Sequence, residues 1–426
     1  MKKKISILVF PCGSEIGLEI YRSLQFSNHI KIFGGSSVDD HGKFIYKNYI
    51  PNIPFYNQEN FYESLKKIVK TYKIDAIYPA MDSVSSALAG FDIELGCKII
   101  GSSKETNLIC LSKTKTYSIL QDKVSTPKIF DSIFEIDSYP VFMKPDIGYG
   151  SRGTKLVHSQ TELKTHLNQY PSAIISENLP GEEYTVDCFT NKYGELLFSE
   201  PRKRVRIVNG ISVNTQLVNN KKNEFIEFAE NINKTIKFRG AWFFQVKKRA
   251  NGSLCLLEVA CRLGGSSALF RNKGVNFALL SIFDAFDIKV DLFYNDFDIV
   301  LDRALSNKFK INITFNKVYV DFDDCLVLEN KIVNTKLLSL IYKAINEQKK
   351  VILITKHNGD ILETLKKFRL QNTFDEIIHL KKESKKYLHI DKKQSIFIDD
   401  SHKERNEVYK NIGIPVFSPD SIESLI

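Results

Sequence analysis

Two stretches of alternating apolar strands and helices, one at each end of the chain, constrain the fold more than any other feature. In the first stretch we predict strands at residues 5–10, 30–34 and 76–79 and a helix at 61–72; in the second, strands begin near residues 318, 351 and 395. This alternation favours parallel sheets whose faces are covered by helices. We therefore predict an α/β unit at each end of the chain.

The stretch between them has a different pattern. A short helix opening at residue 113 is followed by strands that we predict at 141–145, 173–177, 184–189, 242–247 and 254–259. This order indicates an α+β region with an antiparallel sheet. The predicted fold class is a multidomain α/β and α+β chain. We place domains at 1–110, 111–295 (with a nucleotide-binding part at 111–187) and 317–426, and a connector at 296–316.

Composition limits the compartment and the partners. The seven cysteines form no Cys-x-x-Cys pair, so we expect reduced thiols. The first apolar run is too short for a signal peptide or a membrane span, and we expect a soluble, cytoplasmic protein with no membrane partner. The charge of +10 fits a lysine-rich solvated surface or attraction of anionic substrates. Without a basic helix or an aromatic–basic motif in the sequence, we expect no nucleic-acid partner.

A glycine-rich loop follows the first strand of the middle region. Gly148, Gly150, Ser151 and Gly153 belong to this loop, and Lys144 lies just before it. Backbone N–H groups in such a loop can bind phosphate oxygens, and glycine lets the backbone approach closely. A lysine at this point adds a positive charge to the phosphate site. An ordinary glycine-rich surface loop is the alternative.

An acidic segment follows the next predicted strand. Its first residues, Glu177, Asn178 and Leu179, can address an adenine edge through their backbone groups. Glu183 can accept hydrogen bonds from ribose hydroxyls. This segment therefore adds candidate base-binding and ribose-binding groups to the phosphate loop.

Gln245 and Glu258 lie on two consecutive predicted strands joined by an Asn-Gly turn. Strands joined by a short turn form a hairpin, so the two side chains are expected near each other. Their oxygens are suitable ligands for Mg²⁺. A solvated strand position is the alternative for each residue taken alone.

Together, in this order and spacing, these motifs resemble the ATP-grasp superfamily, nearest to its carbamoyl-phosphate-synthetase-like and amino-acid-ligase branches. The resemblance covers residues 1–290 and implies a preATP-grasp domain, an ATP-grasp domain, and ATP with Mg²⁺ (or Mn²⁺). It assigns Lys113 and Lys144 as the two nucleotide lysines and Gly148, Gly150, Ser151 and Gly153 as the phosphate loop. It assigns Glu177 to Leu179 as the adenine hinge and Glu183 as the ribose acid. Gln245 and Glu258 correspond to the two metal ligands, and Arg262 corresponds to the arginine near the transferred phosphate. Ala260 departs from the usual Asn, so other groups must complete the metal coordination.

The family resemblance also implies a reaction. ATP phosphorylates a carboxylate, and an amine then attacks the acylphosphate to give an amide, ADP and phosphate. Arg202, Arg204 and Arg206 alternate on a predicted strand and are expected on one face, where they can hold the substrate carboxylate or the acylphosphate. A solvated basic strand is the alternative.

The C-terminal α/β stretch carries carboxylates at its predicted strand ends. Asp321 and Asp323 follow the first strand, Thr355 ends the second, and Asp399 and Asp400 end the third. The carboxyl ends of parallel strands meet at one edge of a sheet. One carboxylate can attack phosphorus while another protonates the leaving oxygen. We therefore predict a phosphate and Mg²⁺ site at this edge.

This unit resembles the haloacid dehalogenase superfamily over residues 317–426. The resemblance implies that Asp321 is the nucleophile and Asp323 the acid/base group, and that both are also metal ligands. It implies that Thr355 is the phosphate-binding hydroxyl and that Lys382, with Lys385 as the alternative, is the lysine of the site. Asp400 corresponds to the metal-binding acid, with Asp399 and Glu404 nearby. The sequence between Asp323 and Thr355 is too short for a sizeable cap, so an open site is expected. A docking domain without activity is the alternative.

We therefore expect an ATP-dependent carboxylate–amine ligase fused to a phosphatase that acts on a phosphorylated substrate or product. Surface-polysaccharide or small-peptide biosynthesis would suit such a fusion. The expected partners are small carboxylates and amines, some of them phosphorylated, and a second copy in a homodimer. A kinase that releases a phosphorylated product and a non-catalytic nucleotide sensor or scaffold are the alternatives.

Overall fold

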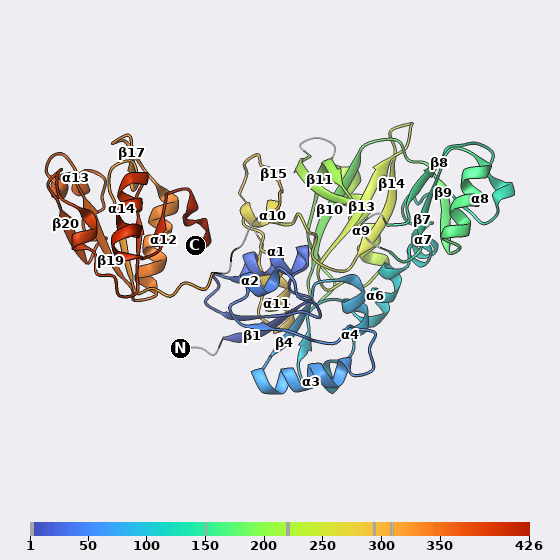
Figure 1. Cartoon of the computed structure of the whole chain (residues 1–426). Helices are drawn as coiled ribbons and strands as arrows, with labels where there is room; N and C mark the ends of the chain where they lie inside the picture. Colours follow the sequence, from blue (N-terminus) through green and yellow to red (C-terminus); the bar gives the residue numbers. More distant parts are fainter. Residues whose placement is uncertain are drawn as a thin grey trace. The chain divides into compact units, whose positions relative to one another are not determined.

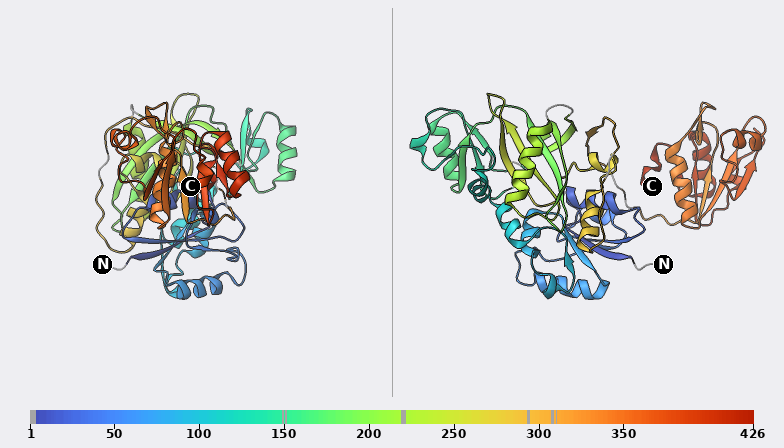
Figure 2. Two further views of the ribbon diagram at one scale, coloured as in Figure 1. Left: turned by 60° about the vertical axis from the view of Figure 1, so that its left-hand side comes forward. Right: turned by 180° about the vertical axis from the view of Figure 1, so that it is seen from behind.

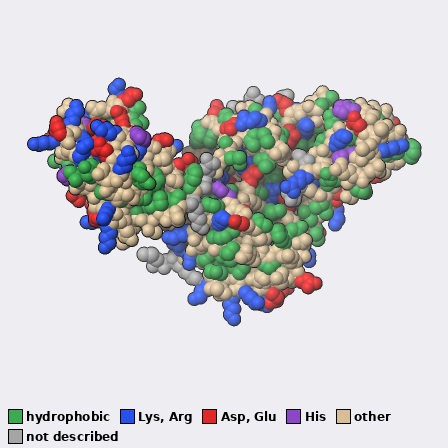
Figure 3. All heavy atoms as spheres, viewed as in Figure 1, with side chains coloured by type: hydrophobic (Ala, Val, Ile, Leu, Met, Phe, Trp, Pro, Cys, Tyr) green, Lys and Arg blue, Asp and Glu red, His purple; other side chains and the backbone are tan. Residues whose placement is uncertain are grey.

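The computed structural model describes residues 4–148, 150, 152–218, 222–292, 295–306, 309 and 311–426. It divides into two compact units, Met1–Leu305 and Ser306–Ile426, called units 1 and 2 below (Figure 1). Among the described residues, no helix is both long and apolar enough to span a membrane. On the face drawn in Figure 3, lysine and arginine side chains are scattered and mixed with acidic ones.

Unit 1 begins with a parallel sheet in the spatial order β3-β2-β1-β4-β5. Its strands are β1 (Ile5–Phe10), β2 (Ile30–Gly35), β3 (Tyr49–Ile50), β4 (Ala76–Pro79) and β5 (Lys98–Ile99). The connecting helices are α1 (Glu15–Leu24), α2 (Gly42–Ile45), α3 (Phe61–Tyr72), α4 (Asp82–Leu88) and α5 (Asp92–Leu95). In β1, Val9 packs with α1 on one face of the sheet, whereas Leu8 packs with α3 on the other. The predicted parallel α/β arrangement is confirmed here.

Two antiparallel sheets follow. The four-stranded sheet, in the order β6-β9-β7-β8, contains β6 (Ile129–Phe130), β7 (Val141–Pro145), β8 (Lys155–Val157) and β9 (Ala173–Glu177). The six-stranded sheet, in the order β14-β13-β10-β11-β12-β15, contains β10 (Glu183–Thr190), β11 (Leu196–Val208), β12 (Ile211–Leu217), β13 (Gly240–Lys248), β14 (Leu254–Ala260) and β15 (Val300–Asp302). The α+β prediction for this region is confirmed.

Helices cover these sheets and join them to the first layer. They are α6 (Lys104–Leu111), α7 (Lys113–Leu120), the 3₁₀ turn η1 (Ile133–Glu135), α8 (Gln160–Gln169), α9 (Lys222–Thr235), α10 (Ala268–Asn272) and α11 (Phe277–Ala285). Phe225 and Ile232 of α9 pack with Phe244 against one face of the six-stranded sheet (Figure 2, right). On the four-stranded sheet, Leu163 of α8 joins a small cluster with Val141.

The segment expected to be a connector contributes a strand to unit 1. β15 pairs antiparallel with β12 and forms an edge of the six-stranded sheet. Directly after β15, Arg303 forms an ion pair with Glu15 and donates to Ser266 Oγ at 3.3 Å. Unit 1 therefore extends beyond the boundary predicted at residue 296. A three-residue strand is too short to show a period-2 pattern, which explains why the sequence did not reveal it.

Unit 2 is a parallel sheet in the order β20-β19-β16-β21-β22. Its strands are β16 (Lys317–Val320), β19 (Lys350–Thr355), β20 (Glu376–His379), β21 (Ser395–Ile398) and β22 (Val416–Phe417), and a hairpin of β17 (Val327–Leu328) and β18 (Ile332–Val333) follows β16. Its helices are α12 (Thr335–Asn346), α13 (Ile361–Lys367), α14 (His402–Ile412) and the 3₁₀ turns η2 (Lys386–His389) and η3 (Ser421–Leu425). Helices α12 and α13 pack on one face of the sheet, and α14 packs on the other.

Candidate active sites

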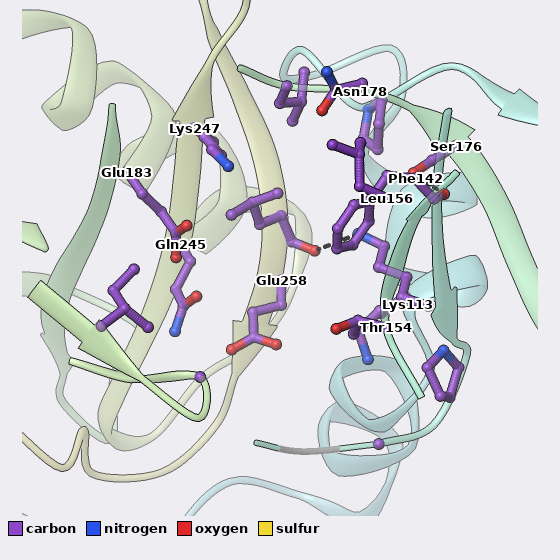
Figure 4. A pocket seen from close by; sticks show the side chains of 18 of the residues that line it. Lys113, Phe142, Thr154, Leu156, Ser176, Asn178, Glu183, Gln245, Lys247 and Glu258 are labelled. Atoms are coloured by element: carbon purple, nitrogen blue, oxygen red, sulfur yellow. Dashed lines mark hydrogen bonds between the residues drawn. The ribbon is translucent and has the colours of Figure 1, made fainter. Parts of the chain in front are cut away.

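A cavity of about 290 Å³ lies between the four-stranded and six-stranded sheets of unit 1 (Figure 4). Strands β7, β8 and β9 line one side, and β10, β11, β13 and β14 line the other. The lining includes most of the residues predicted for nucleotide binding: Lys113, Lys144, Gly148, Gly150, Glu177, Asn178, Leu179, Glu183, Arg204, Gln245 and Glu258. The fold therefore brings together residues whose separation in the sequence is up to about half the length of unit 1.

Gln245 and Glu258 are direct Cα partners in the β13–β14 hairpin. Figure 4 shows both side chains pointing into the cavity from the same wall. The prediction that they lie near each other is confirmed. An amide oxygen and a carboxylate side by side suit a divalent cation that also binds phosphate oxygens, because Mg²⁺ prefers oxygen ligands. Ala260, two residues further along β14, is buried and offers no ligand, so water or nucleotide oxygens would complete the coordination.

Lys144 is buried on β7, on the side of the cavity opposite Gln245 and Glu258. Its Nζ donates to Tyr117 Oη at 2.6 Å and to the Leu257 carbonyl at 3.4 Å. Burial, with a further contribution from Lys113, lowers the pKa of Lys144 to about 8. Lys113 opens α7, and its Nζ donates to the Asp146 carbonyl at 3.2 Å. Helix α7 thus supplies Lys113 and, through Tyr117, holds Lys144, the two lysines predicted to bind phosphate.

The apolar wall of the cavity is formed by residues that the sequence analysis did not identify. Phe142 and Leu156 are Cα partners on β7 and β8, and both line the cavity. Figure 4 shows them across the cavity from Gln245. Phe142 lies two residues before Lys144 on the same strand, so the period of two could have placed it on the same face. This wall suits the flat, apolar faces of an adenine ring.

Glu177 has a structural role at the cavity edge. Its carboxylate accepts from Arg249 Nη2 at 2.7 Å and from the Lys128 N–H at 2.9 Å. Although burial acts in the opposite direction, these hydrogen bonds hold the pKa of Glu177 below its usual value. The side chain is therefore committed to the protein, and the backbone of the predicted adenine hinge, through Asn178 and Leu179, is the part available to a base.

Arg204 connects Glu183, the predicted ribose acid, with Gln245, a predicted metal ligand. It forms an ion pair with Glu183, and its Nη1 donates to Gln245 Oε1 at 2.5 Å. The predicted alignment of Arg206 with it is wrong, because the register of β11 shifts between the two residues. Arg206 is 56% exposed and pairs with Asp302 at 2.8 Å instead.

Part of the predicted phosphate loop lies beside the cavity. Gly148 and Gly150 line it, and Gly153 follows with φ of 71°, a conformation that glycine adopts without strain. Ser151 lies outside the described residues. Arg152 also lines the cavity, although the sequence analysis did not single it out.

Arg262 lies beyond the end of β14, outside the main cavity lining. Its Nε donates to Asp82 Oδ1 at 2.8 Å, and its guanidinium lies 5.2 Å from the centre of the Phe243 ring. Asp82 opens α4 at the carboxyl end of β4. The arginine predicted to act near the transferred phosphate is thus held by Asp82 of the first layer of unit 1.

Unit 2 gathers its acidic residues around a lysine. Oxygens of Asp321, Asp399 and Asp400 lie within 4.8 Å of one another, a suitable set for Mg²⁺. Lys386 Nζ donates to Asp321 at 2.5 Å and to Asp399 at 2.6 Å. Burial raises the pKa of Asp321, and Lys386 opposes this effect. Asp321 and Asp399 are buried and Asp400 is exposed, and a divalent cation would add positive charge to balance these carboxylates.

The position of this lysine corrects the sequence prediction. Lys382 is exposed, and Lys385 Nζ is bound to Glu407 at 2.9 Å. Lys386 opens η2, which turns its side chain inward where it is 3% exposed. Six lysines between residues 381 and 393 look alike in sequence, and only the turn decides which one faces Asp321.

The remaining predicted residues of unit 2 also lie at this edge. Thr355 ends β19, is buried, and accepts from the His357 N–H at 3.1 Å. Asp323 is half exposed, and His357 contacts it at 2.8 Å, a partner that the sequence analysis missed. Glu404 lies in the first turn of α14 and accepts from Lys356 at 2.6 Å.

Comparisons with known proteins agree with the geometry of unit 1. Residues 169–299 match a family model described as "ATP-grasp in the biosynthetic pathway with Ter operon". The chain is 27% identical over 158 residues to a D-alanine–D-alanine ligase of Thermotoga petrophila, covering 33% of this chain and 51% of the relative. A D-alanine–D-alanine ligase of Fusobacterium nucleatum is 33% identical over 93 residues, 22% of this chain and 32% of that relative. The chain thus spans about half the length of these relatives, or less.

Solved structures share the fold at low sequence identity. The L-amino acid ligase of Bacillus licheniformis has a TM-score of 0.55 at 17% identity, over 67% of this chain and 75% of that chain. The N5-carboxyaminoimidazole synthetase of Staphylococcus aureus with ADP has a TM-score of 0.56 at 16% identity, over 68% and 80%. The biotin carboxylase domain of the Hydrogenobacter thermophilus 2-oxoglutarate carboxylase with MgADP has a TM-score of 0.58 at 14% identity, over 68% and 72%.

Proposed function

We propose that the chain, which has the ATP-grasp fold over about two-thirds of its length, is an ATP-dependent carboxylate–amine ligase. The observation that carries this proposal is the Gln245–Glu258 pair, which faces a cavity that also holds Lys113 and Lys144. Two oxygen ligands opposite two lysines suit a metal-bound polyphosphate. The D-alanine–D-alanine and L-amino acid ligases among the similar proteins favour a ligase over other ATP-using reactions.

In this proposal the adenine lies against Phe142 and Leu156, and its edge meets the backbone of Asn178 and Leu179. The ribose hydroxyls donate to Glu183, which requires its ion pair with Arg204 to open or to be shared. Lys113 and Lys144 bind the phosphates. Bound Mg²⁺, or Mn²⁺, would draw electron density from the phosphates at Gln245 and Glu258. The site's main contribution is positioning and charge neutralisation.

The reaction then has two balanced steps. A carboxylate oxygen of the first substrate attacks the γ-phosphorus of ATP, and the bond from phosphorus to the bridging oxygen breaks to release ADP. The amine of the second substrate attacks the acyl carbon, phosphate leaves with the electron pair of the carbon–oxygen bond, and the amine loses a proton. In this proposal Arg262 would neutralise charge on the transferred group. The names of the relatives favour amino-acid-like acids and amines as substrates.

Phosphorus NMR of the full chain with Mg-ATP, a pool of amino acids and a pool of amines tests the ligase. We expect ADP and phosphate only when acid and amine are both present, and no turnover by Glu258→Gln. Glu230→Gln on the exposed face of α9 is the matched control. A phosphorylated acid that accumulates stably with or without amine would instead identify a kinase, and nucleotide binding without turnover would identify a sensor.

We propose a separate phosphatase activity for unit 2. The arrangement that supports it is Lys386 between Asp321 and Asp399, with Thr355 at the same sheet edge. Asp321 would attack the phosphorus of a phosphomonoester while Asp323 protonates the leaving oxygen, and water would then hydrolyse the aspartyl phosphate. The substrate would be a phosphorylated reactant or product of the ligase, and Mg²⁺ would bind at Asp321, Asp399 and Asp400.

Hydrolysis of p-nitrophenyl phosphate by the full chain with Mg²⁺ tests this activity. We expect Asp321→Asn to abolish it and Asp420→Asn, an exposed substitution outside the site, to leave it intact. Equal activity in both variants would show that the hydrolysis does not arise from this carboxylate. Cytoplasmic location, the homodimer and a biosynthetic pathway remain predictions.

A further inference from the structure

We propose that His357 is a positioning residue that holds the acid/base group Asp323 of unit 2 through a ring of fixed tautomer. The inference rests on the proposed phosphatase and extends it to a residue outside the predicted set. His357 follows Thr355 at the carboxyl end of β19. Its Nδ1 lies 2.8 Å and 3.1 Å from the two carboxylate oxygens of Asp323.

The two partners differ sharply in exposure. The His357 side chain is 9% exposed, whereas that of Asp323 is 47% exposed. An exposed carboxylate would ordinarily sample several rotamers. A buried ring that contacts both of its oxygens restricts it to one orientation. The restriction matters for an acid/base group, because proton transfer requires hydrogen-bond geometry to the leaving oxygen.

The hydrogen bonds on the far side of the ring define its tautomer. His357 Nε2 lies 3.1 Å from Thr364 Oγ1, and that hydroxyl donates its one proton to the Asp360 carbonyl at 2.8 Å. The threonine oxygen therefore accepts from His357, so Nε2 carries a hydrogen. Only Nδ1 remains to face Asp323. With Nε2 protonated, Nδ1 of the neutral ring can only accept, so Asp323 donates to it when its carboxyl group carries a proton.

Further contacts fix the ring in place. It packs edge-on against Phe322, with centroids 5.2 Å apart and an interplanar angle of 72°. The His357 N–H donates to Thr355, and its carbonyl lies 2.8 Å from His379 Nε2. Asp360, which receives the threonine hydroxyl, also caps α13 by accepting from the Leu362 N–H at 2.8 Å. The ring is thus tied to two β-strands and to the start of a helix.

The consequence is a division of work between the two catalytic carboxylates. Asp321 has Lys386 as its partner, together with Asp399 on the metal side of the site. Asp323 has His357 as its partner, and the backbone N–H of His357 donates to the Thr355 hydroxyl. The first pair serves attack on phosphorus, and the second serves the leaving oxygen. Loss of His357 should therefore affect substrates according to how much their leaving group needs a proton.

Two phosphomonoesters separate this role from a structural one. p-Nitrophenyl phosphate releases an anion that is stable at neutral pH, whereas benzyl phosphate releases an alkoxide that needs a proton. General acid catalysis contributes ~10²- to 10⁴-fold, so partial loss of positioning in His357→Phe should lower kcat/KM for benzyl phosphate by about 30-fold. For p-nitrophenyl phosphate we expect less than a threefold change. His357→Asn, whose amide oxygen can accept in place of Nδ1, should recover part of the loss, and Thr364→Val should show a smaller loss of the same kind.

The controls distinguish failure of this inference from failure of the phosphatase. His389→Asn, an exposed histidine at the end of η2, should match the wild type on both esters. Equal losses on both esters in His357→Phe would assign His357 a structural role only and leave the phosphatase standing. A wild-type chain inactive on both esters would remove the phosphatase and this role with it. Nitrogen NMR of ¹⁵N-histidine-labelled full chain, with His357→Asn to identify the signal, should show a protonated Nε2; a hydrogen on Nδ1 alone would overturn the inference whatever the activity.

Discussion

Arg249 and Glu177 join the two walls of the nucleotide cavity. Arg249 lies at the turn of the β13–β14 hairpin and donates to Glu177 at the end of β9, and it also donates to the Ser125 hydroxyl at 2.5 Å and the Thr126 carbonyl at 2.8 Å. One guanidinium thus links the hairpin that carries Gln245 and Glu258 to the sheet that carries Phe142. We expect this link to help set the distance between the two walls.

Glu177→Gln should therefore weaken nucleotide binding without changing the chemical step. A hydrogen bond to a charged group contributes ~1.5–3 kcal/mol. We expect the loss of part of this free energy to raise the KM for ATP about tenfold, while kcat stays within twofold of the wild-type value. Steady-state kinetics at saturating acid and amine would measure it. Lys203→Met, which removes an exposed ion pair with Glu182 outside the cavity, is the control. A fall in kcat at unchanged KM would contradict the proposed role.

Nucleotide affinity should decrease as pH rises above 8. Burial and Lys113 lower the pKa of Lys144 to about 8, so its ammonium is present below this pH and lost above it. One pKa unit corresponds to ~1.4 kcal/mol, so we expect the Kd for ADP to rise about tenfold between pH 7 and pH 9. Calorimetric titration across this range would measure the trend. Lys144→Met should bind weakly and show a flatter pH profile, and a wild-type profile just as flat would contradict the assignment.

The same lysine makes a prediction about stability. Its pKa in the folded chain is about 8, against a usual value of 10.5, so between these values the unfolded chain binds more protons. Stability should therefore rise with pH through this window, and at pH 7 the buried ammonium costs on the order of 3 kcal/mol. We expect Lys144→Met to unfold at a higher temperature than the wild type at pH 7, with the difference shrinking by pH 10. A lower Tm at pH 7 would show that packing around the ammonium outweighs its desolvation.

Lys386, and not Lys382, should be required for phosphatase activity. Lys386→Met leaves Asp321 and Asp399 without their shared cation, and loss of one partner from a buried ion pair costs ~3–5 kcal/mol. We expect undetectable hydrolysis of p-nitrophenyl phosphate and a lower Tm for unit 2. Lys382→Met is the matched substitution on an exposed lysine. It should keep the hydrolysis rate within twofold of the wild type and leave the Tm unchanged. Loss of activity in Lys382→Met would restore the original assignment.

Arg262→Lys should impair phosphoryl transfer more than nucleotide binding. Arg262 is held by Asp82 and lies outside the nucleotide cavity lining, so ADP affinity should stay within threefold. Loss of one group that stabilises charge in a transition state costs ~10²- to 10³-fold in rate, and we expect a fall in kcat of this size. Single-turnover ADP formation would measure the step directly. A weakened ADP complex with unchanged kcat would place the arginine at the nucleotide instead.

Local patterns in the sequence were sufficient where the relevant contacts are local. The Asn-Gly turn between two apolar runs predicted the β13–β14 hairpin, and the hairpin brings Gln245 beside Glu258. In the two parallel sheets, strands β1, β2, β4, β16, β19 and β21 were predicted within a residue or two, because strand and helix alternate clearly there, whereas the short strands β3, β5, β20 and β22 were not predicted. Carboxylates at strand ends were expected at one edge of unit 2 for the same reason, and Asp321, Asp399 and Asp400 meet there.

The incorrect predictions each depend on geometry that a short stretch of sequence does not contain. The register shift in β11 turns Arg206 away from Arg204, and strict alternation cannot anticipate such a shift. The choice of Lys386 depends on the turn that opens η2. His357 went unnoticed because a single histidine after a strand has no distinctive spacing, and its partners Asp323 and Thr364 lie on different elements.

The edge strand β15 has a practical consequence for dividing the chain. A shortened protein that ended near residue 295 would lose the strand that covers β12, together with Arg303 and its ion pair with Glu15. The backbone N–H and C=O groups of β12 would then be uncovered, and bare strands of this kind pair with other chains. Such a fragment should precipitate or form oligomers, whereas a fragment that ends after Leu305 keeps β15 paired with β12. Ligase activity without unit 2 is best sought in the longer fragment.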